Sequence, residues 1–264
     1  MLVDYHIHTK MCGHANGEME EYVESAIKNG LTEMGFSDHF PLFHIEPGDL
    51  SMKMEDFPLY IKKVKEMQEK YKDKITIRLG CEVEYSADIE KPTKEMLSKY
   101  NFDYLLGSTH FLGMWIFDHP DHKDEFEKRD VYEIYSNYFT GLEKMISSRM
   151  FDIVAHIDLI KKFGYRPSRP LEEIYSKIAK AINNSSMAIE INTSGLRKPV
   201  KEMYPAAQLL KICFETNIPV TLGSDAHKPE EVTRDFDKAV LLIKNAGYTK
   251  IAQFANRKRT LINI

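Results

Sequence analysis

The sequence predicts an α/β protein of parallel strands and covering helices, and a closed (β/α) barrel fits it best. Short apolar, strand-like runs alternate with amphipathic helical segments along almost the whole chain. These helices supply the long connections that parallel strands need. Histidines and carboxylates follow nearly every strand-like run. A barrel gathers all its strand ends around one pocket, whereas a doubly wound open sheet offers a single switch point, so the pattern favours the barrel.

Seven strands are expected, at Leu2–His8, Glu33–Asp38, Ile75–Glu84, Tyr104–His110, Ile153–His156, Ala188–Asn192 and Pro219–Ser224. The helices between and after them are expected at Glu18–Lys28, Met54–Lys72, Pro92–Ser98, Val131–Ser147, Leu171–Asn183, Met203–Thr216 and Pro229–Asn245. Gly30 and Gly247 are typical helix stop signals. The tail Arg259–Ile264 either adds a short closing strand or straps the barrel, so the barrel is expected to be irregular.

Composition favours one domain over residues 1–264 that acts on a small molecule in the cytoplasm. The chain has 264 residues, 43% of them hydrophobic, which suffices for one large core. Net charge is -4, and Lys and Arg are scattered rather than gathered in a stripe, which argues against nucleic-acid binding. Three widely spaced cysteines argue against a disulfide framework and for a reducing compartment. No signal peptide or membrane-spanning run is expected, and oligomeric state is not indicated.

The strongest local signal is the pair His6 and His8 at the end of the first strand. Residues two apart on a strand face the same side, so both imidazoles can reach one metal ion. Taken alone, the pair fits two solvated histidines equally well. Asp225 and His227 repeat the same spacing after the last strand, next to the small residues Gly223 and Ser224. Two such pairs on different strand ends favour a metal site.

Single candidate ligands follow the strands between these two pairs. His39, His110 and His156 each stand where an apolar run turns polar, although each alone is typical of a hydrogen-bonded pocket or loop histidine. Glu82 and Glu84 share one face of a strand, and burying either is costly without a cation or hydrogen-bond donors. One of these glutamates is expected to meet a metal.

Together these residues resemble the motifs of PHP (polymerase and histidinol phosphatase) domain hydrolases. The motifs run in order from residue 2 to about the C-terminus: Asp4-Tyr5-His6-Ile7-His8-Thr9, His14-Ala15, Gly35-Phe36-Ser37-Asp38-His39, Gly80-Cys81-Glu82-Val83-Glu84, Gly107-Ser108-Thr109-His110, Ala155-His156-Ile157-Asp158, Glu190-Ile191-Asn192-Thr193 and Gly223-Ser224-Asp225-Ala226-His227. Within the family, the N-terminal part is most similar to monofunctional histidinol-phosphate phosphatases. The resemblance implies a distorted seven-stranded (β/α) barrel, TIM-barrel-like, with the active site at the C-terminal ends of the strands.

The resemblance also implies three divalent ions, Zn, Mn or Fe, held by nine residues. It assigns one ion to His6, His8, Glu82 and Asp225, and a second to Glu82, His110 and His156. The third falls to His14, His39 and His227. A bridging ligand must be a carboxylate because its two oxygens can bind two cations. The choice of Glu82 over Glu84 as the bridge rests on the family motif.

The expected reaction is hydrolysis of L-histidinol phosphate to L-histidinol and phosphate, a step of histidine biosynthesis. A hydroxide bridging the ions would attack phosphorus in line while the ions neutralise the phosphate oxygens. The alkoxide leaving group needs stabilisation by a metal or a protonated side chain. Asp225 and His227 are candidates for that side chain, beside the bridging Glu82, and the sequence leaves the choice open.

Substrate contacts are expected on loops after the strands. Arg197 suits phosphate because its planar fork donates two hydrogen bonds, and Lys161 and Lys162 are further candidates or simply a solvated basic loop. The loop Phe111–His122 either covers the pocket, with Asp118 facing the cationic end of the substrate, or packs as a hydrophobic flap on a helix. The histidines outside the metal motif, treated first as loop residues, are His44, His119 and His122.

Two other functions compete with this one. The same ligands could hydrolyse a sugar, nucleotide or protein-tyrosine phosphate, or the end of a nucleic acid, although no polymerase region or basic track supports nucleic acid. A non-enzymatic binding module would be expected to have lost ligands, and all nine positions are filled.

Overall fold

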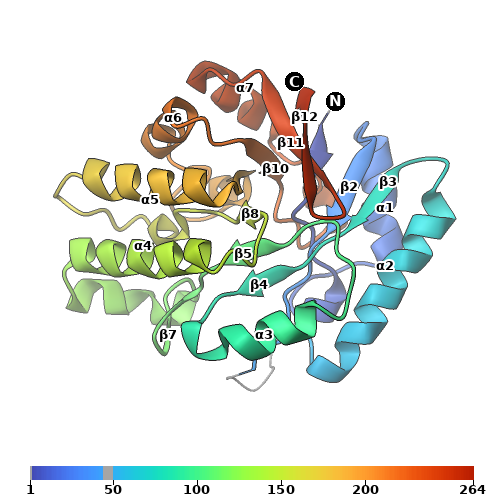
Figure 1. Ribbon diagram of the computed structural model, residues 1–264, viewed down its shortest axis with the longest axis horizontal. Helices are drawn as coiled ribbons and strands as arrows, with labels where there is room; N and C mark the ends of the chain where they lie inside the picture. Colours follow the sequence, from blue (N-terminus) through green and yellow to red (C-terminus); the bar gives the residue numbers. More distant parts are fainter. Residues whose placement is uncertain (1, 44–49) are drawn as a thin grey trace.

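The computed structural model describes residues 2–43 and 50–264, and eight short parallel strands form its centre (Figure 1). The strands are β1 (Val3–Asp4), β2 (Glu33–Phe36), β3 (Thr76–Leu79), β4 (Glu82–Glu84), β5 (Leu106–Ser108), β8 (Ile153–Val154), β9 (Ala188–Asn192) and β10 (Val220–Gly223). One sheet has the order β1-β2-β3 and the other the order β10-β9-β8-β5-β4. His44, which was expected in a loop, lies outside the described residues.

Hydrogen bonds join the two sheets at both edges, so the strands form a distorted ring. The Tyr5 amide donates to the Leu222 carbonyl at 3.1 Å, which links β1 to β10. The Phe40 amide donates to the Glu82 carbonyl at 2.7 Å, which links the end of β2 to β4. Strands β3 and β4 are the two halves of the expected strand Ile75–Glu84, so the ring has the seven predicted positions.

The break between β3 and β4 has a packing cause. A Cβ atom on Gly80 would lie 2.2 Å from the ring of Tyr104, which is fully buried and donates its hydroxyl to the Tyr5 carbonyl at 2.7 Å. The tyrosine ring thus occupies the space that a side chain at position 80 would need. The chain steps around it, and the two halves of the strand pair with different neighbours.

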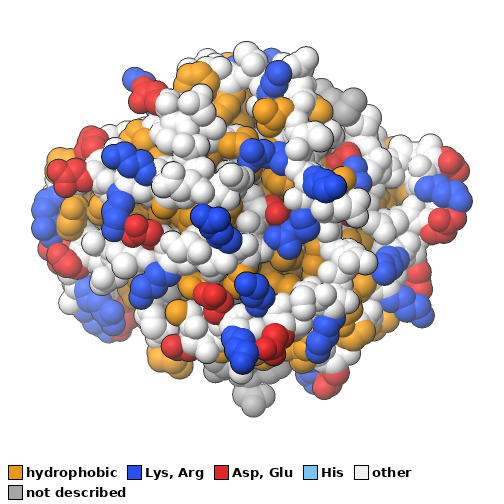
Figure 2. Space-filling model, viewed as in Figure 1, with side chains coloured by type: hydrophobic (Ala, Val, Ile, Leu, Met, Phe, Trp, Pro, Cys, Tyr) orange, Lys and Arg blue, Asp and Glu red, His pale blue; other side chains and the backbone are white. Residues whose placement is uncertain are grey.

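Helices cover the outside of this ring (Figure 1). They are α1 (Met19–Lys28), α2 (Phe57–Tyr71), α3 (Glu90–Leu97), α4 (Val131–Ser147), α5 (Glu172–Ser185), α6 (Ala207–Glu215) and α7 (Phe236–Ala246). In α4, Ile134, Tyr138, Leu142 and Met145 are buried at helical spacing, which turns one face toward the strands. On the face seen in Figure 2, basic and acidic side chains are interspersed over the surface.

Two helices begin at least four residues later than the sequence pattern predicted. The expected helix Met203–Thr216 starts at Ala207, because the preceding Ala206 amide instead donates to the Asp158 carboxylate at 2.8 Å. The expected helix Pro229–Asn245 starts at Phe236, because Thr233 and Asp235 adopt left-handed backbone angles with φ of 62° and 63°. Among the described residues, no helix is long and apolar enough to span a membrane.

The C-terminal tail straps the barrel instead of closing it. Strands β11 (Lys250–Ala255) and β12 (Lys258–Asn263) pair with each other as an antiparallel hairpin. At the turn, Arg257 donates its amide to the Asp103 carbonyl and its guanidinium to the Met150 carbonyl, at 2.8 and 2.7 Å. Asp103 and Met150 precede β5 and β8, so the hairpin crosses the amino ends of the strands and leaves the carboxyl ends open.

Candidate metal centre

Glu82 is the centre of a cluster at the carboxyl ends of the strands. It is 1% exposed, and both of its carboxylate oxygens face imidazole nitrogens. Oε2 lies 3.0 to 3.5 Å and Oε1 lies 2.9 and 3.6 Å from these nitrogens. The five histidines that surround it are His6, His8, His39, His110 and His156. Glu82 therefore has the geometry of a carboxylate shared between two cations.

Asp225 and the remaining histidines complete this cluster. The Asp225 Oδ1 atom lies 3.4 Å from His8 Nε2, 3.8 Å from His6 Nε2 and 3.5 Å from His227 Nδ1. The His227 ring stacks on His14 with a centroid separation of 4.8 Å. Three-residue groups that could hold an ion include His6, His8 and Glu82; Glu82, His110 and His156; and His14, His39 and His227. The structure thus brings the nine sequence candidates to one place.

Buried carboxylates orient these imidazoles from behind. The His6 Nδ1 atom lies 2.6 Å from Glu190 Oε1, and His110 Nδ1 lies 2.8 Å from Glu84 Oε2. A carboxylate on Nδ1 keeps the proton there and leaves the Nε2 lone pair aimed at the cluster. Glu84 thus lies behind His110, and Glu82 lies at the centre.

Glu190 is the functional residue that sequence reasoning passed over. Besides His6, it accepts hydrogen bonds from the His156 amide at 2.8 Å and the Asn192 side chain at 3.0 Å. The sequence signal is an acidic residue inside the apolar run Ala188–Asn192, where an uncompensated charge would be costly. Asn192 and Ser194 in turn donate to Asp225 Oδ2 at 3.3 and 3.0 Å.

The electrostatics of the cluster suit cations. Burial alone would raise the pKa of Glu82, but His39 and His6 hold it well below its usual range. Burial alone would lower the pKa of His110, but Glu84 and Glu82 raise it to about 10. Burial and the charge of His39 lower the pKa of His8 to about 3. Ionised carboxylates thus face protonated and neutral imidazoles, and divalent ions would replace those protons.

Buried atoms without partners give an independent test of whether cations fit. Within residues 2–43 and 50–264, His6 Nε2 and Glu82 Oε2 are buried and make no hydrogen bond of normal geometry, although they lie only 3.2 Å apart. A buried imidazole nitrogen or carboxylate oxygen without a hydrogen bond destabilises the fold unless it binds a ligand such as a metal ion. The mixture of imidazole and carboxylate donors suits Zn, Mn or Fe.

A pocket of about 460 Å³ opens above the cluster. Arg197 lines it and donates from Nη2 to the Ser224 carbonyl at 2.7 Å, beside the ligand Asp225. Lys198 and Lys228 line the same wall. These three basic side chains therefore line the pocket beside the cluster, where an anionic group could enter.

Asp118 also lines the pocket, and it pairs with Lys162 Nζ at 2.9 Å. Burial alone would raise the pKa of Asp118, but Lys162 lowers it below its ordinary value, so the carboxylate stays ionised. Trp115 turns away from the pocket and packs against Phe126 at 4.9 Å. The expectation of a packed hydrophobic flap holds for Trp115 and Phe117, which are buried, while Phe111 and Asp118 line the pocket. The contact of Asp118 with a substrate stays a prediction. His119 and His122 do not line the pocket.

Lys161 does not line the pocket, so it cannot contact a substrate there. Its side chain is fully buried, donates to the Met203 carbonyl at 2.7 Å, and pairs with Asp158 at 2.8 Å and Glu202 at 3.2 Å. The prediction failed because Lys161 is the last residue of a 3₁₀ helix, η5 (Leu159–Lys161), that buries its side chain, whereas the next residue, Lys162, lines the pocket.

The comparisons with known proteins agree with this geometry. The PHP domain family matches residues 4–194. A probable histidinol-phosphatase of Deinococcus radiodurans is 37% identical over 97% of this chain and 98% of its own length. The histidinol-phosphatase of Bacillus subtilis is 29% identical over 87% of this chain and 94% of its own. The crystal structure of histidinol phosphate phosphatase from Lactococcus lactis, complexed with zinc, L-histidinol and phosphate, covers 98% of both chains with a TM-score of 0.86 and 24% identity, which shows the shared fold.

Proposed function

Since the chain belongs to the PHP domain family, we propose that it is a metal-dependent phosphatase that hydrolyses L-histidinol phosphate to L-histidinol and phosphate in histidine biosynthesis. The observation that carries the proposal is the buried Glu82 carboxylate surrounded by five imidazoles. Relatives named histidinol-phosphatase align over nearly the whole chain, and the related Lactococcus lactis structure was determined with zinc, L-histidinol and phosphate.

Three ions per chain fit the donors. The first ion would be held by His6, His8, Glu82 and Asp225. The second would be held by Glu82, His110 and His156, so that Glu82 serves both ions. The third would be held by His14, His39 and His227. When bound, the ions would supply Lewis acidity that lowers the pKa of water and neutralises phosphate charge. Glu190 and Glu84 would hold the histidine rings in the tautomer that binding requires.

The phosphate group would lie against the wall of the pocket that carries Arg197, Lys198 and Lys228. Arg197 is 3.3 Å from Glu231 through Nε and bonded to the Ser224 carbonyl through Nη2, so its guanidinium is held in one orientation before substrate binds. A fixed cation of this kind lowers the ordering cost of binding an anion. The cationic amino or imidazole end of the substrate would lie beside the ionised Asp118, which lines the same pocket.

Asp225 and His227 suit metal binding better than proton donation. Burial alone would raise the pKa of Asp225, but His6, His8 and His227 hold it well below its usual range. Burial and the charge of His8 lower the pKa of His227. Both side chains are therefore unprotonated near neutral pH, and neither is a ready source of a proton for the leaving oxygen.

A substrate panel tests the proposal. The purified protein with added Mn²⁺ should release phosphate from L-histidinol phosphate far faster than from sugar, nucleotide or tyrosine phosphates. Glu82→Ala should abolish turnover and metal retention. Asp118→Asn should raise KM for L-histidinol phosphate and leave turnover of a small aryl phosphate nearly unchanged. Equal rates across the panel would reject the substrate, and no phosphate release from any ester would reject the reaction.

A further inference from the structure

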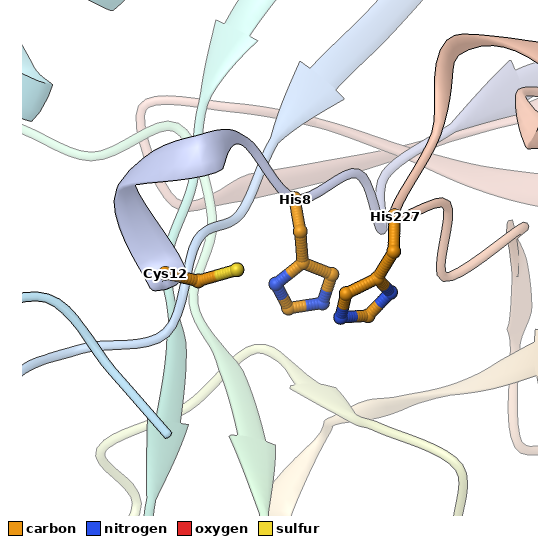
Figure 3. A group of neighbouring side chains, drawn as sticks. All are labelled: His8, Cys12 and His227. Carbon is orange, nitrogen blue, oxygen red and sulfur yellow. The ribbon is translucent and has the colours of Figure 1, made fainter. Parts of the chain in front are cut away.

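The thiol of Cys12 lies against the metal cluster without belonging to the nine donors. Its sulfur and one ring nitrogen each of His8 and His227 all lie within 4.8 Å of one another. Figure 3 shows the sulfur pointing toward the His8 ring, with the His227 ring on the other side of His8. Cys12 is fully buried. A soft donor therefore stands beside two imidazoles in a site otherwise built of nitrogen and oxygen.

A short turn fixes the thiol in this position. The 3₁₀ helix η1 (Lys10–Cys12) begins directly after the strand end that carries His8. Thr9 caps it by accepting the Met11 amide at 3.2 Å, and the Cys12 amide donates to the Thr9 carbonyl at 3.1 Å. Gly13 ends the turn with φ of 91°, a conformation that glycine adopts without strain. The turn folds the sulfur back over the histidine four residues earlier.

An unpartnered nitrogen faces this position. His8 Nδ1 is buried and, within the described residues, makes no hydrogen bond. The Asp38 Oδ1 atom lies 3.6 Å from His8 Nδ1, which is too far for a hydrogen bond. Asp38 already accepts hydrogen bonds from the amide and hydroxyl of Thr9. His8 Nδ1 is therefore a buried donor site without a ligand.

The protonated Cys12 thiol is a poor ligand for hard cations. Ions such as Mg²⁺ or Mn²⁺ prefer oxygen and nitrogen and do not displace a thiol proton readily. Thiophilic ions do displace it, because the metal–sulfur bond compensates for the lost S–H bond.

We propose that Cys12, His8 and His227 form an inhibitory binding site for thiophilic metal ions, of which Cd²⁺ is a representative. The ion would bond to the Cys12 sulfur as the S–H proton leaves to the buffer, and no electron is transferred. Around an ion of the size of Zn²⁺, tetrahedral coordination places sulfur and nitrogen donors about 3.3–3.6 Å apart. The larger Cd²⁺ needs a somewhat wider spacing, so small rotations of three side chains whose donor atoms lie within 4.8 Å of one another would complete the site.

Inhibition follows from the shared ligands. His8 and His227 are also donors to two of the three ions of the proposed function, so an ion at Cys12 removes a ligand from both. The inhibition rests on the proposed phosphatase activity, whereas the binding does not. The two parts can therefore be measured separately.

Binding is tested on the metal-free protein by titration with Cd²⁺, with the ultraviolet sulfur-to-cadmium charge-transfer band as the readout. The double variant Cys81→Ser/Cys213→Ser keeps Cys12 as the single cysteine of the sequence and should show the band at one equivalent. Cys12→Ser and Cys12→Ala should lack it, and either variant serves if it melts cooperatively. A band that persists without Cys12, or is absent from the wild type, would overturn the proposal.

Cys81 is the matched control for burial. It is also fully buried, and its thiol donates to the Asp38 carbonyl at 3.2 Å, but it belongs to none of the metal-binding groups of the described residues. With Mn²⁺-loaded enzyme, Cys12→Ser should raise the Cd²⁺ concentration for half-inhibition by at least about tenfold, while Cys81→Ser leaves it unchanged. Equal sensitivity of the two variants would refute the inhibitory role. Absence of phosphatase activity would reject the proposed function alone and leave the binding result standing.

Discussion

Replacement of Glu190 by glutamine tests whether the carboxylates behind the histidines set metal affinity. Glu190 accepts three hydrogen bonds, from His6 Nδ1 at 2.6 Å, from the His156 amide at 2.8 Å and from the Asn192 side chain at 3.0 Å. A glutamine has one acceptor oxygen and one amino group. If its amino group faces His6, the proton moves to Nε2 and blocks the lone pair aimed at Glu82. If the oxygen faces His6, the amino group opposes two other donors.

Either orientation of the glutamine should reduce the affinity of the cluster for metal ions by a similar factor. Loss of a carboxylate behind a metal-binding histidine reduces affinity about 10–100-fold, or about 1.4–2.7 kcal/mol. Glu190 is 1% exposed, so water cannot replace the missing acceptor, and the upper half of that range is expected. The two ions served by His6 and His156 should both bind more weakly, because one carboxylate supports both residues.

The assay is competition between the metal-free protein and a fluorescent chelator for Zn²⁺, combined with metal analysis after dialysis. Glu84→Gln is the matched control, since Glu84 supports only His110, at 2.8 Å from Nδ1, and should weaken one ion. Circular dichroism must show that both variants fold. A Glu190→Gln protein that retains all its ions with wild-type affinity would refute the view that this carboxylate acts on the metals.

Three further outcomes are expected. Gly223→Ala should lose metal as Glu190→Gln does, because the new Cβ would lie 1.8 Å from Glu190 Oε1, and metal analysis of the folded variant checks this. Lys161→Met should lower the free energy of unfolding in urea by about 3–5 kcal/mol, because it leaves the charge of the fully buried Asp158 unpaired, while KM stays unchanged. Metal binding should release protons at neutral pH and weaken as pH falls, because the pKa of His110, raised to about 10, keeps that ring protonated in the metal-free protein. Calorimetry in buffers of different ionisation enthalpy measures the release, and pH-independent affinity between pH 6 and 8 would contradict it.

Local pattern predicted the strands and the histidine and carboxylate pairs at their ends, whereas the full set of nine ligands, His14 among them, was implied by the resemblance to PHP domain hydrolases. Side chains alternate along an extended segment, so His6 and His8 were expected to share a face, and both lie beside Glu82 Oε2 although the regular strand β1 ends at Asp4. The positions of Lys161 and Lys162 could not be read this way. Lys161 ends the short 3₁₀ helix Leu159–Lys161 and Lys162 follows it, and the contacts that hold Lys161 inside include the distant Met203 and Glu202 as well as Asp158.

Residues that act across the barrel were equally hidden from the sequence. Glu190 lies 184 positions from His6, and their contact exists only because hydrogen bonds join β1 to β10, which itself pairs with β9. The break between β3 and β4 likewise depends on the Tyr104 ring, which reaches Gly80 from another strand. Sequence spacing predicts neighbours along one element, whereas these contacts are set by closure of the ring.

In the proposed function, the chemistry and the choice of substrate would reside on separable parts of this fold. The metal-binding donors stand on strand ends or in the short turns after them, where buried carboxylates and backbone hydrogen bonds fix their positions. Arg197 and Asp118 line the pocket from segments between the strands, and their side chains bond to the Ser224 carbonyl and to Lys162 rather than to a histidine of the cluster. Loop residues can therefore change without disturbing the ions, and a substitution at Asp118 should alter which ester is preferred before it alters the rate on a substrate that makes no contact there.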